Sequence, residues 1–82
     1  MENVEIIEKI RHLLAEEFEV DIELIRSDAS LMDTLNMDSL DLVDMVVLLD
    51  QNFGIKMAGK DFVGIKTFQN LYDLLIAKIN EQ

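Results

Sequence analysis

The 82-residue chain lacks cysteine, proline and tryptophan and has only one histidine. Without cysteine it has no disulfide, no thiolate nucleophile and no cysteine-ligated metal site. The single histidine, His12, is remote in sequence from the aspartates, which do not follow the pattern of a calcium-binding loop. We therefore expect no metal site, and any thiol chemistry has to come from a group acquired from outside the chain.

Long apolar runs are also missing. Apolar residues make up 50% of the chain, yet no segment approaches the ~20 consecutive apolar residues of a membrane span. The opening MENVEIIEKIRHLL is acidic and helically periodic, unlike a secretory signal. A chain of 82 residues has room for one domain, over residues 1–82. We expect a monomeric cytoplasmic protein without membrane insertion.

Positive charge is scarce. The chain holds 17 acidic and seven basic residues, for a net charge of −10 and a pI near 4.2. The acidic excess lies in residues 1–55, whereas residues 56–82 hold three acids and four bases. Such a surface disfavours nucleic acids and anionic membranes and favours basic proteins as partners. We therefore expect basic protein partners and no nucleic-acid partner.

Apolar spacing predicts an all-α fold. Apolar residues recur every three or four positions over residues 4–18 and 39–53, and strict alternation nowhere lasts long enough for a strand. Thr67 should cap a last helix. The residues expected to be buried along that helix are Phe68, Leu71, Tyr72, Leu75 and Ile79.

Two shorter features complete the predicted fold. One short helix is expected at residues 60–63, and Ser30 with Asp33 provides the start of one helical turn. Residues 19–37 should otherwise form a long loop held against the core by scattered apolar side chains. The prediction is a small bundle of three longer helices plus one short helix, with this long loop between the first two.

The helix predicted at residues 39–53 is apolar on two sides. It should begin after Asp38, an N-cap whose carboxylate accepts a backbone N–H, and end where Gly54 takes a left-handed conformation. The side that faces the core consists of Leu42, Met45, Val46, Leu49 and Phe53. The other side, roughly 130° away, consists of Leu40, Val43 and Val47. This second side either packs under the long loop or forms an exposed partner-binding strip flanked by carboxylates.

Ser39 lies in the first turn of this helix, and three interpretations compete for it. A hydrolase nucleophile would need a base, but His12 is on another helix and no G-x-S-x-G elbow surrounds the serine. A plain helix-start serine is common, because its hydroxyl suits a helix N-terminus. A covalent modification site is also well placed, because free N–H groups and the positive dipole end tolerate an attached phosphate. The residues alone do not choose between the last two.

The stretch DSLDLVDMVVLLDQNFGI, residues 38–55, resembles the modification site and recognition helix of acyl carrier proteins. The resemblance extends to DASLMDTLNM before it and, more loosely, to KTFQNLYDLL after it, so that it covers nearly the whole chain. In that family the serine of Asp-Ser-Leu receives 4'-phosphopantetheine from coenzyme A. The short motif becomes specific in combination with Leu35, Phe53, the acidic balance and the all-helical pattern.

The resemblance implies that a phosphopantetheinyl transferase attaches 4'-phosphopantetheine to Ser39 and that acyl groups then travel as thioesters on its thiol. Other implied partners have basic docking patches: acyl or malonyl transferases, ketosynthases and acyl-activating ligases of fatty acid, polyketide or related biosynthesis. The implied docking residues are Asp38, Leu40, Asp41, Val43, Asp44 and Val47. The implied lining of an acyl-chain pocket is Leu42, Val46, Leu49, Ile65, Leu71 and Leu75. Such a chain is a substrate of enzymes and has no catalytic residues of its own.

The chain departs from the housekeeping members of that family in charge. Where those continue the recognition helix with glutamates, it has Asp50, Gln51 and Asn52. Where a proline and further acids follow in those members, it has Lys56, Met57 and Lys60, and Asn36 stands where they have a glycine. The departures predict a specialised carrier for a polyketide-like, lipid-modifying or other secondary pathway. Two alternatives stay open: a stand-alone peptidyl or aminoacyl carrier, and an unmodified acidic helical adaptor.

Overall fold

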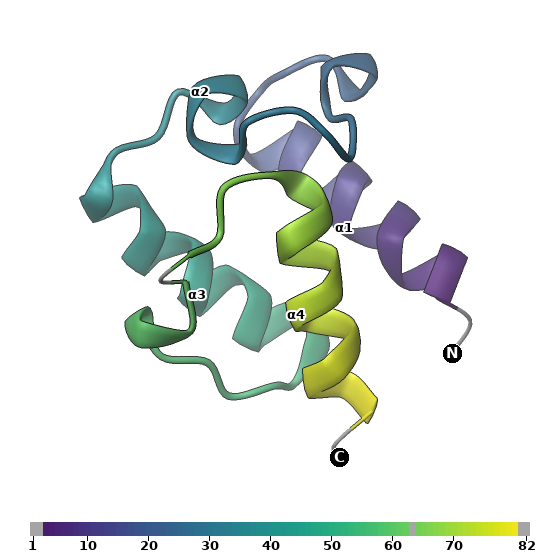
Figure 1. Cartoon of the computed structure of the whole chain (residues 1–82), viewed down its shortest axis with the longest axis vertical. Coiled ribbons are helices and arrows are strands. Elements are labelled where there is room, and N and C mark those ends of the chain that lie inside the picture. The colour runs from purple at the N-terminus through teal and green to yellow at the C-terminus, as the bar shows by residue number, and fades with distance from the viewer. Residues whose placement is uncertain (1–2, 63, 81–82) are drawn as a thin grey trace.

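The computed structural model describes residues 3–62 and 64–80, and it contains no β-strand within them (Figure 1). Three long helices form the body of the molecule: α1 (Asn3–Glu17), α3 (Ser39–Phe53) and α4 (Phe68–Asn80). Three short segments link them: the 3-10 helix η1 (Ile22–Leu24), the helix α2 (Leu31–Leu35) and the 3-10 helix η2 (Gly59–Phe62). The predicted all-α bundle is therefore confirmed. None of the described helices has the length and apolarity needed to cross a bilayer.

The long helices bury their apolar sides in one shared core. α1 and α4 lie side by side in the bundle, and α3 packs across from them (Figure 1). The long helices supply Ile6, Ile10, Leu14, Met45, Leu49, Phe68, Leu71, Tyr72 and Leu75. Of the stripe predicted on the last helix, only Ile79 is partly rather than fully buried, because it lies near the end of α4.

α1 ends one residue earlier than the apolar pattern predicts. Glu19 takes a left-handed backbone conformation with φ 55°, and the N–H of Val20 donates to the carbonyl of Ala15 at 3.1 Å. Such a left-handed residue closes the last turn of a helix. Phe18 therefore lies in the turn after Glu17, half-buried, instead of inside the helix.

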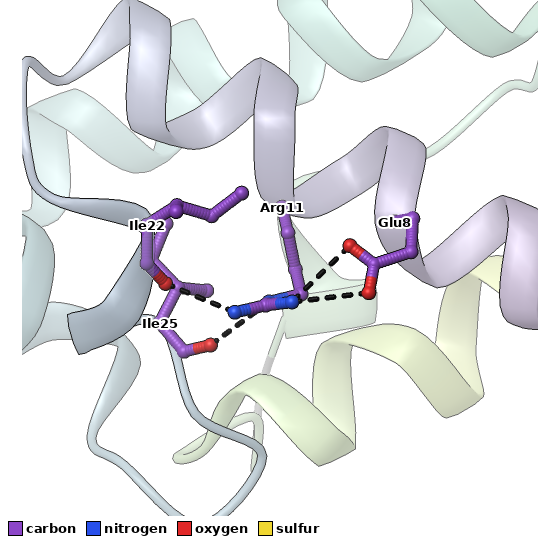
Figure 2. Close-up of polar contacts among 4 residues, drawn as sticks. All are labelled: Glu8, Arg11, Ile22 and Ile25. Carbon is purple, nitrogen blue, oxygen red and sulfur yellow. Dashed lines mark hydrogen bonds and ion pairs between the residues drawn. The ribbon is translucent and has the colours of Figure 1, made fainter.

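Arg11 of α1 holds the start of the long connection. Its Nε donates to the carbonyl of Ile25 at 3.1 Å, and its Nη2 donates to the carbonyl of Ile22 at 3.0 Å. Its Nη1 lies 3.1 Å from both carboxylate oxygens of Glu8 (Figure 2). The planar guanidinium thus joins α1 to η1 through three separate nitrogen atoms. The buried side chain of Ile25 adds an apolar anchor at the same place.

The middle of the long connection is tied to the start of α4. Ser30 and Thr67 form an isolated antiparallel bridge, in which the N–H of Leu31 donates to the carbonyl of Lys66 at 2.9 Å. Ser30 also caps α2, as predicted, by accepting the N–H of Asp33 at 3.3 Å. The predicted long loop is therefore held near its start by Arg11 and in its middle by the bridge to Thr67, and it carries η1 and α2.

The start of α4 has the cap predicted for it. The hydroxyl of Thr67 accepts the N–H of Asn70 at 3.3 Å, and Oδ1 of Asn70 accepts the N–H of Thr67 at 3.1 Å. The two residues therefore satisfy each other's backbone donors, as in a capping box.

The short helix predicted at residues 60–63 is observed as η2, which begins one residue earlier, at Gly59; Val63 lies outside the described residues. Oδ2 of Asp61 accepts the N–H of Ala58 at 2.9 Å and lies 3.8 Å from Nζ of Lys78. This contact ties η2 to α4, while η2 packs beside α3.

Candidate functional site

Ser39 is the first residue of α3, as predicted. Before it, α2 ends at Leu35, and Asn36 takes a left-handed conformation with φ 53° and ψ 48°. The next residue, Met37, is buried, and its N–H donates to the carbonyl of Met32 at 2.9 Å. This short link therefore fixes the start of α3 against the core.

A reciprocal capping box closes the start of α3. Oδ1 of Asp38 accepts the N–H groups of Leu40 and Asp41 at 3.0 and 3.1 Å. In return, Oδ2 of Asp41 accepts the N–H of Asp38 at 3.1 Å. The cap at Asp38 was predictable, but the return bond from Asp41 was missed. The sequence signal for this hydrogen bond is a pair of carboxylates three residues apart, as in the Ser-x-x-Glu form of the capping box.

The surroundings of Ser39 fit a covalently attached phosphodiester. α3 is 15 residues long, and its N-terminus presents the positive end of the helix dipole. The residues before and after it in the chain, Asp38 and Leu40, are exposed. Because Asp38 already occupies two of the free N–H groups, the geometry suits covalent attachment better than capture of a free phosphate.

The second apolar side of α3 is exposed to solvent. Leu40 is 78% exposed, Val43 62% and Val47 51%, and we call these three residues the α3 strip. Asp44 is exposed between them. The alternative in which this side packs under the long loop is therefore wrong.

The residues predicted to line an acyl-chain pocket all belong to the packed core. Leu49, Leu71 and Leu75 are fully buried. Leu42, Val46 and Ile65 are partly buried and pack against the same cluster. The structure thus brings residues of α3, α4 and the segment after η2 together in one apolar cluster.

Known proteins are similar to the chain over most of its length. Residues 8–75 match the family model described as a phosphopantetheine attachment site. The acyl carrier protein of Thermosynechococcus vestitus is 33% identical over 79 residues, which are 96% of this chain and 98% of that protein. The acyl carrier protein of Saccharopolyspora erythraea is 36% identical over 76 residues, 93% of this chain and 80% of that protein. The polyketide-8 synthase acyl carrier protein 2 of Streptomyces avermitilis is 30% identical over 74 residues, 90% and 85% of the two chains.

The matched residues include the whole of α3 with its capped N-terminus, and the fold is the small helical bundle that the resemblance implies. The prosthetic group of such a domain is 4'-phosphopantetheine, bound covalently. The chain belongs to the acyl carrier protein family.

Proposed function

We propose that this chain carries acyl intermediates as thioesters on a 4'-phosphopantetheine arm attached to Ser39. The observation that carries the proposal is the position of Ser39 in an Asp-Ser-Leu motif at the capped start of α3. A thiol-ended arm there supplies the thioester chemistry that a chain without cysteine lacks. The chain acts over its whole length as one carrier domain in the cytoplasm, and it is a substrate of its partner enzymes rather than an enzyme.

The docking surface of this carrier is the α3 strip with its flanking carboxylates, Asp38, Asp41 and Asp44. Exposed apolar side chains beside negative charges fit an enzyme surface that combines a basic patch with an apolar groove. Exposed ion pairs are individually worth only about 0–1 kcal/mol, so these complexes should be weak and sensitive to salt. Such complexes suit a carrier that visits a transferase, a ketosynthase or a ligase in turn.

The core side of α3 is the proposed shelter for the acyl chain. Its candidate lining is part of one apolar cluster beneath α3 and consists of Leu42, Val46, Leu49, Ile65, Leu71 and Leu75. Because these side chains already pack against one another, a guest chain has to separate α3 from α4 and the segment after η2. Burial of its methylenes, at about 0.8 kcal/mol each, is the driving force.

The charge of the η2 region favours a specialised pathway over housekeeping fatty acid synthesis. Lys56 and Lys60 are exposed there, while the only acid of η2, Asp61, is engaged by Lys78. A polyketide synthase carrier is among the similar proteins, beside carriers whose names state no pathway. The alternative is a stand-alone carrier of amino acids.

Loading of the phosphopantetheine form tests this proposal. The modified protein is incubated with malonyl-coenzyme A and a malonyl transferase, or with amino acids, ATP and an adenylation enzyme, and is then weighed by mass spectrometry. We expect an acyl adduct that hydroxylamine removes, as it does a thioester, and no adduct on Ser39→Ala. Aminoacyl loading alone would assign the chain to the peptidyl class. Loading with neither substrate class, alongside a known carrier that is loaded, would contradict the proposal.

A further inference from the structure

A pocket of about 540 Å³ lies between α1, the long connection and α4, and we call it the α1–α4 pocket. α1 contributes Ile7, Glu8 and Arg11, the connection contributes residues 25–28, and α4 contributes Tyr72. No residue of α3 lines it, so the pocket is separate from Ser39 and from the α3 strip. Its volume lies within the ~300–1,000 Å³ of small-molecule sites.

Tyr72 brings a buried hydroxyl without a partner to this pocket. The residue is 2% exposed, and its Oη has no hydrogen-bond partner among the described residues. The charges that act on the phenol are those of Arg11 and Glu8, which line the pocket too, so the hydroxyl end of the ring lies on the pocket side. Burial raises the pKa of Tyr72, so the phenol keeps its proton at neutral pH and is able to donate it. A ligand that accepts this hydrogen bond would remove the cost of the unpaired group.

Arg26 provides an unpaired cation in the same pocket. Its side chain is exposed and makes no hydrogen bond or ion pair with the described residues. Arg11, by contrast, has its three guanidinium nitrogens engaged by Glu8 and by backbone carbonyls (Figure 2). The other charged residue of the lining, Asp28, is exposed and unpaired as well. One free guanidinium suits one negative charge, while the carboxylates of Asp28 and Glu8 repel a second.

We propose that the α1–α4 pocket binds a monocarboxylic acid, whose carboxylate contacts Arg26 and Tyr72 and whose apolar part lies against Ile7 and Ile25. A carboxylate has two acceptor oxygens, which a planar guanidinium and a phenolic hydroxyl are able to share. A phosphate would bring a second charge into a lining that already holds two carboxylates. A neutral alcohol would leave Arg26 without a partner of opposite charge.

The ligand class includes the free form of the proposed cargo. Hydrolysis of a thioester on the arm adds water across the C–S bond and releases a carboxylic acid and the free thiol. This link alone rests on the proposed function. Binding of the acid uses the residues of the α1–α4 pocket and needs no modification of Ser39, so the two proposals are tested separately.

Titration of the unmodified chain with sodium hexanoate tests the proposal, and hexanol serves as a ligand with the same tail and no charge. We expect saturable shifts of the backbone amides of residues 25–28 in heteronuclear NMR spectra. The dissociation constant should be on the order of 1 mM, as is typical of so small a ligand. Tyr72 is the only tyrosine of a chain without tryptophan, so its ultraviolet difference spectrum reports whether the hydroxyl gains a hydrogen bond. Hexanol should bind at least about tenfold more weakly.

Variants then separate the two contacts. Tyr72→Phe should raise the dissociation constant about tenfold, the loss of one hydrogen bond to a charged acceptor. Arg26→Gln should raise it about three- to fivefold, because that residue is exposed. The matched control Lys60→Gln removes the same charge from an exposed position outside the pocket and should change it by less than about 1.5-fold. Circular dichroism checks that each variant is folded.

Three results would overturn the inference. The first is unchanged binding of hexanoate in Tyr72→Phe, and the second is equal affinity for hexanoate and hexanol. The third is a set of shifts confined to α3 and α4, which would place the acid in the proposed acyl shelter instead.

Discussion

Tyr72 of α4 is buried at 2% exposure, and its hydroxyl has no hydrogen-bond partner among the described residues. A buried polar group without a partner keeps its desolvation cost, about 1–3 kcal/mol. Burial raises the pKa of the Tyr72 phenol above its ordinary value of 10.0; the nearby Arg11 opposes the shift, and Glu8 adds to it. The aromatic ring contributes to the core, whereas the hydroxyl works against folding.

We therefore predict that Tyr72→Phe stabilises the protein by about 1 kcal/mol, because it removes the hydroxyl and keeps the ring. Urea unfolding, followed by far-ultraviolet circular dichroism, measures the change in the free energy of unfolding. A loss of stability would show that the hydroxyl makes a contact that this account lacks.

The raised pKa of Tyr72 also implies that the stability of the fold depends on pH in the alkaline range. The folded state has the higher pKa, so it binds the phenolic proton more tightly than the unfolded state does. Stability is therefore complete below about pH 10 and is lost as the pH rises through the folded pKa. Tyr72 is the only tyrosine of a chain without tryptophan, so ultraviolet absorbance of the tyrosinate reports this titration directly. Tyr72→Phe should remove this part of the pH dependence, and an equal alkaline loss in the variant would contradict it.

At the scale of single residues, the sequence predicts which side chains are buried better than which of their polar atoms find partners. The spacing of apolar residues placed Tyr72 in the core correctly. This spacing contains no information on the Tyr72 hydroxyl, because a hydrogen-bond partner would have to come from another element. Arg11 illustrates the same limit: its two carbonyl acceptors lie 11 and 14 residues away and are brought to it only by the fold.

At the scale of elements, the start of α3 depends on its cap. We predict that Asp38→Ala lowers the free energy of unfolding by about 1 kcal/mol, because two backbone N–H groups lose their acceptor. Serine is also a favourable N-cap residue, so Asp38→Ser should retain most of the wild-type free energy of unfolding. Chemical denaturation measures stability, and hydrogen exchange of the Leu40 and Asp41 amides measures fraying of the first turn. Unchanged exchange in Asp38→Ala would contradict the role of the cap.

The elements themselves were largely predictable, because their signals are local. Thr67, Asp38 and Gly54 mark helix ends by their own chemistry, and all three were placed correctly. The end of α1 was missed by one residue because Glu19 is an unusual residue for a left-handed conformation. Isolated bonds across the fold, such as the bridge between Ser30 and Thr67, leave no pattern in the sequence.

At the scale of the whole molecule, charge and the apolar strip were visible in the sequence, but the surface groove between Phe18, just after α1, and Val47 on the outer side of α3 was not. Its two walls come from α1 and α3, which are far apart along the chain. The exposure of the α3 strip was left open by the sequence because a loop of unknown path had the length to cover it. The structure decides this by holding that loop at Arg11 and at the start of α4 instead.

The shelter proposed for the acyl chain involves the whole bundle. We predict that an octanoyl group on the arm raises the midpoint of thermal unfolding above that of the acetyl form, since its methylenes enter the core. The gross gain is on the order of 5 kcal/mol before the cost of separating the helices. Free octanoyl-pantetheine at the same concentration serves as the control and should have little effect. Equal midpoints for the two loaded forms would show that the chain stays outside the core.

Covalent attachment at Ser39 is the central claim, and intact mass tests it most directly. The chain is incubated with coenzyme A, magnesium and a broad-specificity phosphopantetheinyl transferase, beside Ser39→Ala and the exposed control Ser27→Ala. The account predicts a gain of one phosphopantetheine in the wild type and in Ser27→Ala, and none in Ser39→Ala. No gain in a folded wild-type chain, with a known carrier modified in parallel, or a gain that persists in Ser39→Ala, would contradict it.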